Sequence, residues 1–151
     1  MASKGATGAG STFSIGSTPV VVGQVKTIQF NGQKITYDDL TNLSSPMMGT
    51  STVVMGEKLP AKAEAGTLAI GFTYLPLDPG YQALLAAFES QALTAFTVQS
   101  AKVPPQTTTG NSFAFSGYVS EQPLPDIQVD KTMTSKVTIE ISGLIIVTPG
   151  T

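Results

Sequence analysis

The sequence predicts a mainly β domain, a β-sandwich or small barrel, flanked by a single α-helix at about residues 79–92. Several short segments alternate between apolar and polar residues, which is the period of a half-buried strand. One segment instead repeats its apolar residues at steps of three and four, which is the period of a helix. Charged residues make up 12% of the chain, about half the usual share, and the abundant Thr and Val favour sheet over helix.

The predicted helix lies between two predicted strands, Thr67–Tyr74 and Thr94–Val98. Asp78 is placed to act as its N-cap, and Pro79 suits its first position, where the missing N–H loses no hydrogen bond. The apolar residues of the helix fall along one stripe, which we expect to pack on the sheet as core. The stripe consists of Tyr81, Leu84, Leu85, Phe88 and Ala92.

The N-terminal third predicts an arm followed by a hairpin. Residues 1–11 are small and Gly-rich, which predicts a flexible arm, and residues 12–151 are predicted to form one domain. Thr12–Ile15 and Val20–Phe30 are predicted strands. Asn31-Gly32 follows, a dipeptide typical of two-residue hairpin turns. Such a turn would place Ile28 opposite Ile35 and make residues 34–38 the return strand.

The C-terminal third predicts two long strands. Ser112–Val119 alternates, and Asp130–Ser142 shows the clearest alternation in the chain. Between them, the two prolines of Glu121–Asp126 exclude a central strand. Gly143 interrupts the last strand before Leu144–Val147 continues it, which predicts a β-bulge or bend at that glycine.

Residues 39–64 show no sustained period, and we predict a long loop at about residues 44–60. A structureless stretch of this length inside a domain is usually functional. Its apolar residues would be poorly placed in water, so we expect them to contact another protein. The alternative is a loop folded over its own core. The apolar residues in question are Met47, Met48, Val53, Val54 and Met55.

Missing residue types argue against several functions. The chain has no Cys, His or Trp, and all eight of its cationic residues are Lys. It therefore lacks thiolate nucleophiles, the usual general base, the commonest transition-metal ligand and the bidentate phosphate clamp of Arg. The net charge of −2 does not attract nucleic acid, and no apolar run reaches the ~18 residues of a membrane span. We expect no enzyme, no cofactor and no metal site.

Several segments, taken in order, resemble the tail tube proteins, or major tail proteins, of long-tailed non-contractile phages. The helical segment Pro79–Phe88 is the nearest in pattern to the single helix of that family. The other segments are Asp39–Pro46 before the long loop, Ala65–Ile70 after it, and Phe113–Val119 and Val137–Gly143 for the last two strands.

The resemblance implies a structural virion protein without catalytic activity, located in the virion tail and made in the bacterial host cytoplasm. Its copies would form hexameric rings stacked into a hollow tube through which DNA passes without specific binding. Partners implied by the resemblance are the tape measure protein and tail tip or terminator proteins. Residues 44–59 would bridge stacked rings, with contacts at Pro46, Met47, Met48, Val53, Val54, Met55 and Leu59.

Two other functions remain open from the residues alone. A carbohydrate-binding or adhesin-type β-sandwich would fit the fold class and the Ser/Thr-rich loops, although the chain has no Trp for sugar stacking. An enzyme with a Ser or Lys nucleophile is compatible with composition, but none of the motifs associated with such enzymes is present. Self-assembly into tubes would distinguish the tail tube function from the binding module and from the enzyme.

Overall fold

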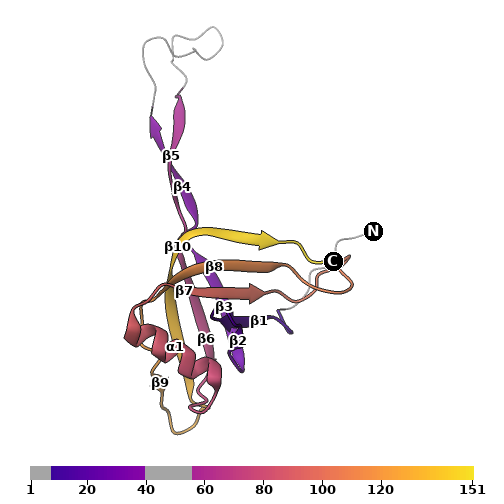
Figure 1. Ribbon diagram of the computed structural model, residues 1–151, viewed down its shortest axis with the longest axis vertical. Coiled ribbons are helices and arrows are strands. Elements are labelled where there is room, and N and C mark those ends of the chain that lie inside the picture. Colours follow the sequence, from indigo (N-terminus) through magenta and orange to yellow (C-terminus); the bar gives the residue numbers. More distant parts are fainter. Residues whose placement is uncertain (1–7, 40–55) are drawn as a thin grey trace.

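The computed structural model describes residues 8–39 and 56–151 of the chain. In this part the chain forms ten strands and one α-helix (Figure 1). The elements are β1 (Thr12–Ile15), β2 (Val20–Val21), β3 (Val25–Asn31), β4 (Lys34–Asp39), β5 (Lys58–Glu64), β6 (Thr67–Thr73), α1 (Pro79–Ser90), β7 (Thr94–Gln99), β8 (Ser112–Val119), β9 (Pro125–Asp126) and β10 (Thr134–Thr148). The prediction of a mainly β fold flanked by one helix is therefore confirmed for the described residues.

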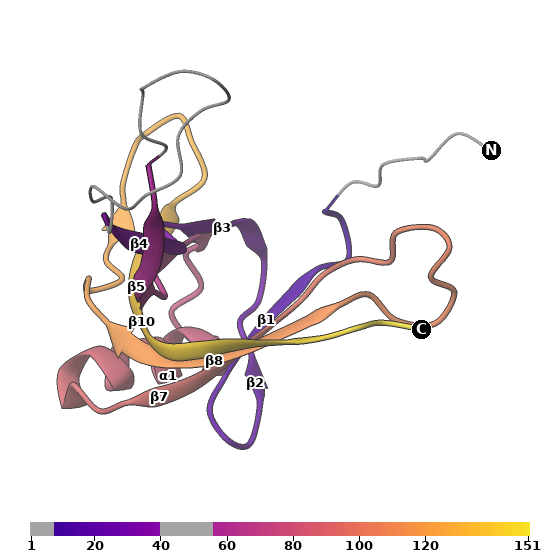
Figure 2. The ribbon, with the colours of Figure 1, turned by 90° about the horizontal axis from the view of Figure 1, so that it is seen from above.

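Eight strands form one sheet that curls into a half-barrel (Figure 2). Its order is β2-β1-β7-β8-β10-β6-β3, and β9 pairs with the start of β10. Every pairing is antiparallel. The remaining two strands, β4 and β5, pair only with each other among the described residues and project from the sheet as an arm.

One face of the half-barrel carries the core. Buried residues of neighbouring strands stand opposite one another, as Phe96 does with Phe115 and Val137 with Ile70. The Phe96 ring lies between those of Phe13 and Phe115, with centroids 5.7 and 5.6 Å away. Because side chains alternate along each strand, this register puts the buried apolar residues of the strands on the same side.

The helix α1 packs on this core face against β1, β2 and β8. It begins at Pro79 with Asp78 as N-cap, as predicted, and ends before Gln91, which adopts a left-handed conformation. Within the predicted stripe, Tyr81 and Leu84 are buried, while Leu85 and Phe88 are half-buried. Ala87, which the prediction left out, is also buried. Ala92 is exposed: the left-handed cap turns the chain away from the helix before it, so the stripe ends at Phe88.

Asp78 fastens the helix to the strand region before it. Its carboxylate accepts hydrogen bonds from the backbone N–H of Tyr81 at 3.2 Å and of Gly23 at 3.1 Å. We expect Asp78→Ala to lower the free energy of unfolding by about 1–2 kcal/mol, because both amides lose their acceptor. Asp78→Asn keeps an acceptor oxygen and is the matched control in thermal unfolding. Equal melting temperatures for both variants and the parent would contradict this role.

The prediction of a hairpin at Asn31-Gly32 is wrong. Ile28 pairs with Ile70 of β6, not with Ile35, and β4 pairs with β5. Instead, the chain continues through Gly32 from β3 into β4. The antiparallel register is kept across this point: Asn31 pairs with Thr67, and Lys34 pairs with Glu64. Gly32 has φ 77°; this positive φ, which suits a turn, here bends a strand out of the sheet.

The C-terminal strand follows the prediction at its bulge and departs from it at its start. The register between β10 and β8 shifts between Ser142 and Ile146, which confirms the irregularity predicted at Gly143. The strand begins at Thr134, four residues later than predicted, because Asp130–Met133 belong to the connection from β9. The two-residue strand β9 pairs with Thr134 and Ser135 at the start of β10, on the side that β8 occupies from Ile139 onward, so its proline does not lie in a central strand.

Candidate assembly surfaces

The arm formed by β4 and β5 extends from the half-barrel along the longest axis of the molecule (Figure 1). It leaves the sheet between Gly32 and Gly66, both with positive φ. A Cβ at Gly66 would overlap the carbonyl oxygen of Asn31, so the two strands approach here more closely than a side chain allows. The sequence Ala65-Gly66 therefore folds as the second half of the bend that begins at Gly32.

Near the half-barrel, one face of the arm is apolar and the other is charged. Toward the outer end the two faces are mixed, because Asp39 pairs with Lys58 on the Ile35 side and Asp38 pairs with Leu59 on the other. Ile35 pairs with Ala63 and Tyr37 with Pro60, which sets these four side chains on the same side. On the opposite face Lys34 forms an ion pair with Glu64 at 3.6 Å. Every residue of β4 is exposed. A two-stranded ribbon with an exposed apolar face is marginally stable alone, which makes this face a candidate contact surface.

A second surface lies where β10 extends beyond the end of its neighbour β6. The partner strand β6 pairs with β10 only as far as Glu140, and the Ile141 N–H then donates to the Gly66 carbonyl at 3.1 Å. Beyond Ile141, no strand among the described residues pairs with this side of β10. Leu144, at 82% exposure, and the neighbouring Ile146 and Val147 are exposed along this segment. An open edge with apolar side chains is a template for pairing with another chain.

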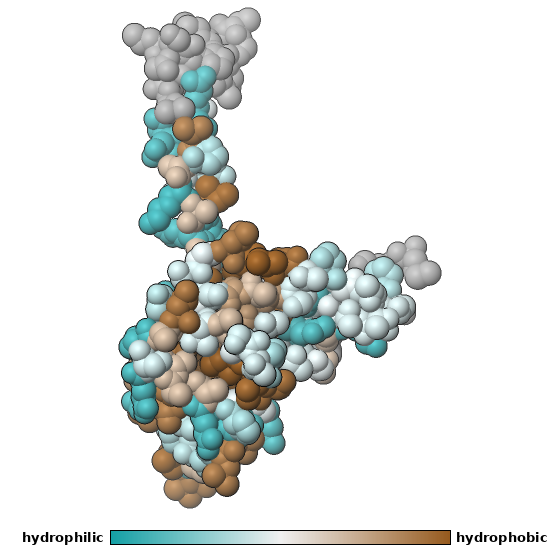
Figure 3. Space-filling view, viewed as in Figure 1, coloured by the Kyte–Doolittle hydropathy of each residue, from teal (hydrophilic) through white to brown (hydrophobic). Residues whose placement is uncertain are grey.

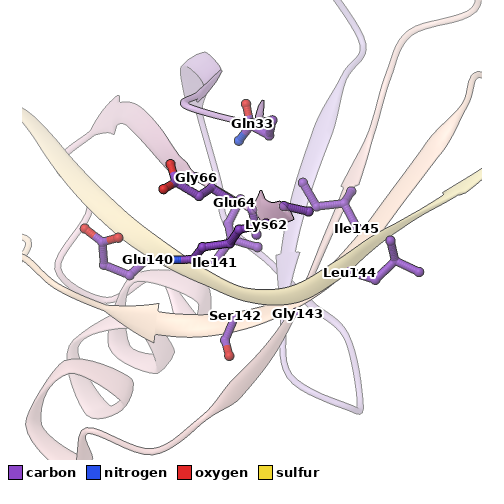
Figure 4. Close-up of a pocket in the computed structure, with 12 residues that line it drawn as sticks. Gln33, Lys62, Glu64, Gly66, Glu140, Ile141, Ser142, Gly143, Leu144 and Ile145 are labelled. Atoms are coloured by element: carbon purple, nitrogen blue, oxygen red, sulfur yellow. The ribbon is translucent and has the colours of Figure 1, made fainter. Parts of the chain in front are cut away.

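A hollow of about 800 Å³ lies between this edge and the base of the arm. Figure 4 shows Gln33, Lys62 and Glu64 of the arm base facing the segment Glu140–Ile145 of β10. The hollow is an open groove lined by both apolar residues, such as Ile141 and Ile145, and polar ones, such as Lys62 and Glu64. This composition suits the edge of a protein chain more than a small substrate.

A third surface lies at the end of the molecule opposite the arm, where the chain passes from β8 through β9 to β10. In Figure 3 hydrophobic residues gather at this end of the molecule. The exposed apolar residues there are Leu124, Ile127, Val129 and Met133, of which Val129 is fully exposed. We call this set the distal surface.

The backbone under the distal surface is held in place. The buried Tyr81 hydroxyl donates to the Pro123 carbonyl at 2.9 Å, and the Ser135 hydroxyl donates to the Leu124 carbonyl at 3.1 Å. Burial raises the pKa of the Tyr81 hydroxyl, and the neighbouring Tyr74 raises it further. The distal surface is thus presented by a fixed backbone, which lowers the entropy cost of binding a partner.

Tyr81→Phe tests this anchor. We expect the free energy of unfolding to fall by about 1–2 kcal/mol, since the buried Pro123 carbonyl loses its donor. Hydrogen exchange in residues 122–130 is expected to quicken more than in β7 or β8. Because the native pKa of Tyr81 is raised, its stabilising effect is present below pH 10.0 and declines as the pH rises above that value. The parent, but not Tyr81→Phe, should show this alkaline decline; identical pH profiles would contradict it.

Most residues of the predicted contact loop lie outside the described residues: Pro46, Met47, Met48, Val53, Val54 and Met55. Leu59 is described and lies in β5 opposite Asp38, where it is exposed. The loop predicted at about 44–60 is therefore strand from Lys58 onward. Of the predicted N-terminal arm, residues 1–7 lie outside the described residues, and Gly8–Gly10 are exposed.

Sequence reasoning did not find the β10 edge or the distal surface. A signal for the edge was present, because Leu144–Val147 is a run of four apolar residues without the alternation of a half-buried strand. The distal surface had no such signal: its apolar residues stand singly in a proline-containing connection. Their common exposure depends on the Tyr81 and Ser135 hydrogen bonds, which join distant parts of the chain.

Neither a metal cluster nor a membrane-spanning helix is present in the part of the chain that the structure describes. No group of three or more acidic, His or Cys side chains there could hold a metal ion. No helix there has both the length and the apolar character needed to cross a membrane. The surfaces that stand out are those that suit contact with other protein chains.

No protein-family model matches the chain, and no curated protein matches it in sequence. Solved structures do match in fold. A chain of the virion of the native gene transfer agent superposes with a TM-score of 0.69 at 10% identity, over 95% of this chain and 99% of that one. The SPP1 tail tube gives a TM-score of 0.61 at 9% identity, over 93% of this chain and 77% of that one. This is the tail-tube fold.

Contractile systems share the tail-tube fold with this chain. A chain of the sheath–tube complex of an extracellular contractile injection system, named PVC, gives a TM-score of 0.62 at 12% identity, over 92% of this chain and 88% of that one. The agreement thus extends over nearly the whole chain in a gene transfer agent virion, a tail tube and a contractile injection system. Since identities of 9–12% are too low to compare side chains, the likeness concerns the fold, including the half-barrel and its single helix.

Proposed function

We propose that this protein is a structural tail subunit whose copies assemble into the hollow tube of a phage-like particle. The observation that carries the proposal is the tail-tube fold combined with two surfaces that an isolated subunit leaves uncovered, the arm and the β10 edge. A monomeric β protein normally protects such edges, whereas an assembling one uses them.

Within this proposal, neighbouring subunits form hexameric rings through their sheet edges. The open side of β10 beyond Ile141 and the outer edge of β3 are both unpaired among the described residues. A contact between two different edges is head-to-tail, and it closes into a ring when the rotation between subunits allows. The tail of an empty gene transfer agent particle, which shares the fold at a TM-score of 0.69, has C6 symmetry.

The sheet face opposite the core suits the wall of a conduit. It carries mainly small or hydroxyl-bearing residues, among them Ala69, Gly71, Ala114, Ser116 and Thr138, with Lys136 and Glu140 as charges of opposite sign. A wall with few cations makes few phosphate contacts, so DNA would pass without being held. Genome delivery through the tube is the role that this surface supports.

Further parts of the proposal concern the particle. The sequence resemblance suggests that the particle is a long-tailed non-contractile phage. It also suggests that the protein is made in the cytoplasm of a bacterial host and is located in the virion tail. Expected partners are a tape measure protein inside the tube and tip or terminator proteins at its ends. Chains of a tube-terminating cap and of a sheath/tube terminator share the fold, which supports partners at the tube ends.

Negative-stain microscopy of the purified protein tests the proposed function. We expect rings or tubes of uniform diameter, increasing with protein concentration. A chain that stays monomeric at high concentration, even with an extract of tail tips, would contradict the proposal. If the same monomer bound glycans specifically on an array, the carbohydrate-binding or adhesin alternative would replace it. A sheath around tubes isolated from particles would overturn the non-contractile assignment alone.

A further inference from the structure

We propose that Gly150 and Thr151 form a latch that closes on the loop between β7 and β8 and thereby holds the open edge of β10 ready for a neighbouring subunit. The inference rests on the proposed function and adds a device that prepares one of its contact edges. We call the loop, residues 100–111, the receiving loop. Figure 2 shows the two parts side by side, with the residues after β10 lying against this loop.

The latch is bound by convergent hydrogen bonds. The three successive backbone N–H groups of residues 107–109 all donate to the Thr151 carbonyl oxygen, at 3.0, 2.7 and 3.2 Å. Successive N–H groups that converge on one oxygen form a nest, which binds an electron-rich oxygen. The Gly150 N–H donates to the side-chain oxygen of Asn111 at 2.9 Å, and the Thr151 N–H donates to the Thr109 hydroxyl at 3.2 Å. Both latch residues are thus tied to the receiving loop through their backbone.

The fit between the latch and the receiving loop is close enough to require glycine. A Cβ on Gly150 would overlap the Thr109 carbonyl oxygen. The receiving loop is also fixed from its other side, where the Ala101 N–H donates to the Ser11 hydroxyl oxygen at 2.9 Å. The latch therefore closes on a fixed receiver, with no room for a larger residue at position 150.

The latch matters because little else holds the outer part of β10. The register with β8 shifts after Ser142, so β8 offers residues 143–145 no partner and pairs again only with residues 146–148. The other side of β10 is unpaired beyond Ile141 in the described part of the chain. Without the latch, we expect this short stretch to fray back toward the bulge, because few contacts hold it.

The same stretch carries the edge that the proposed ring contact uses. Leu144, Ile146 and Val147 are exposed along it. An edge that is already extended binds a partner without having to be ordered first, which lowers the entropy cost of each contact. Asn111, which accepts the Gly150 hydrogen bond, is thus a positioning residue that acts on the edge through the latch.

Two variants open the latch by different means. Asn111→Ala removes the acceptor of the Gly150 N–H. Gly150→Ala forces the latch away from the Thr109 carbonyl, whereas its matched control, Gly8→Ala, adds the same methyl group where the described residues leave open space. We expect amide hydrogen exchange in residues 143–148 to quicken in Asn111→Ala and Gly150→Ala. Exchange in β6 should stay as in the parent, and Gly8→Ala should match the parent throughout.

Assembly is the second readout. Each opened variant is expected to raise the protein concentration needed for tube growth at least ~10-fold, because the edge must then be ordered at every contact. The melting temperature should stay close to that of the parent, since neither Asn111 nor Gly150 belongs to the buried core. A loss of assembly without a loss of stability is what distinguishes a positioning role from a general structural one.

A reversible lock tests the latch itself. The Thr109 and Thr151 hydroxyl oxygens lie 3.5 Å apart, and the chain has no Cys. Thr109→Cys and Thr151→Cys can therefore form a disulfide across the closed latch. In the Asn111→Ala background, oxidation should restore assembly and slow the exchange of residues 143–148, and reduction should reverse both effects. A role of Asn111 confined to its own loop would not be rescued by a bond at position 151.

The outcomes separate the latch from the proposed function. If both opened variants exchange fast in residues 143–148 but assemble like the parent, the latch has no part in assembly, and the tube function stands. Unchanged exchange in both variants would show that the β10 edge does not depend on the latch, which also overturns the inference. A parent chain that forms neither rings nor tubes would overturn the proposed function, and with it the role of the latch in assembly.

Discussion

Deletion of residues 33–65 should yield a folded half-barrel that no longer forms tubes. The deletion removes the arm together with residues 40–55, and it joins Gly32 directly to Gly66. Asn31 already pairs with Thr67, so the two glycines become a two-residue hairpin loop between β3 and β6. Their φ values of 77° and 78° are of the sign that a type I′ turn requires at both positions.

The geometry at the junction supports this design. An added Cβ on Gly32 would lie 3.5 Å from the Gly66 Cα, so the two residues are already close enough to be joined with little movement. Among the described residues of the deleted stretch no side chain is fully buried: β4 is exposed throughout, β5 is exposed except at Glu64, and only Ala65 packs, partly buried, against the core. We therefore expect a melting temperature within a few degrees of the parent, and a complete loss of tubes.

Thermal unfolding and negative-stain microscopy would be read together. A version with two serines inserted between the glycines controls for strain in the new turn. Normal tubes from the shortened chain would show that the arm has no role in assembly. If both shortened chains failed to fold, the arm would be part of the folded domain and not an appendage of it.

Phe96→Ala is expected to have the largest effect on stability. Phe96 is 1% exposed and lies in the middle strand of the aromatic row between Phe13 and Phe115. Its removal leaves a cavity bounded by two rings that belong to separate strands, so the walls cannot easily collapse. We expect the free energy of unfolding to fall by about 3–5 kcal/mol, which corresponds to a melting temperature lower by about 6–20 °C.

The matched control is Leu77→Ala, which truncates a leucine that is 87% exposed and should change the free energy of unfolding by no more than about 0.5 kcal/mol. A melting temperature for Phe96→Ala close to that of the control would contradict the aromatic row as the centre of the core. Chemical denaturation would show in addition whether the slope changes, which would indicate an altered denatured state.

Local features of the chain were predicted well because their causes are local. The helix start at Asp78-Pro79 depends on a side chain bonding an amide three residues away. The irregularity at Gly143 depends on a glycine with φ 88° between two alternating segments. Such features can be read from the sequence, since the residues that decide them are neighbours in it.

The predicted hairpin at Asn31-Gly32 failed for a physical reason. A positive φ at Gly32 is needed both for a tight turn and for the bend by which β3 continues into β4. The choice between them depends on which strand occupies the edge beside β3. That strand is β6, which lies more than thirty residues further along the chain, and Gly66 just before it allows the close approach to Asn31.

The sequence by itself determined the kinds of element, the ends of the helix, the weak charge and the lack of Cys, His and Arg. Only the tertiary structure decided which strands pair, and with that which edges and apolar residues stay uncovered. The difference arises because strand pairing and burial depend on contacts between residues far apart in sequence, as between Tyr81 and Pro123. The surfaces proposed for assembly are what these distant contacts leave open.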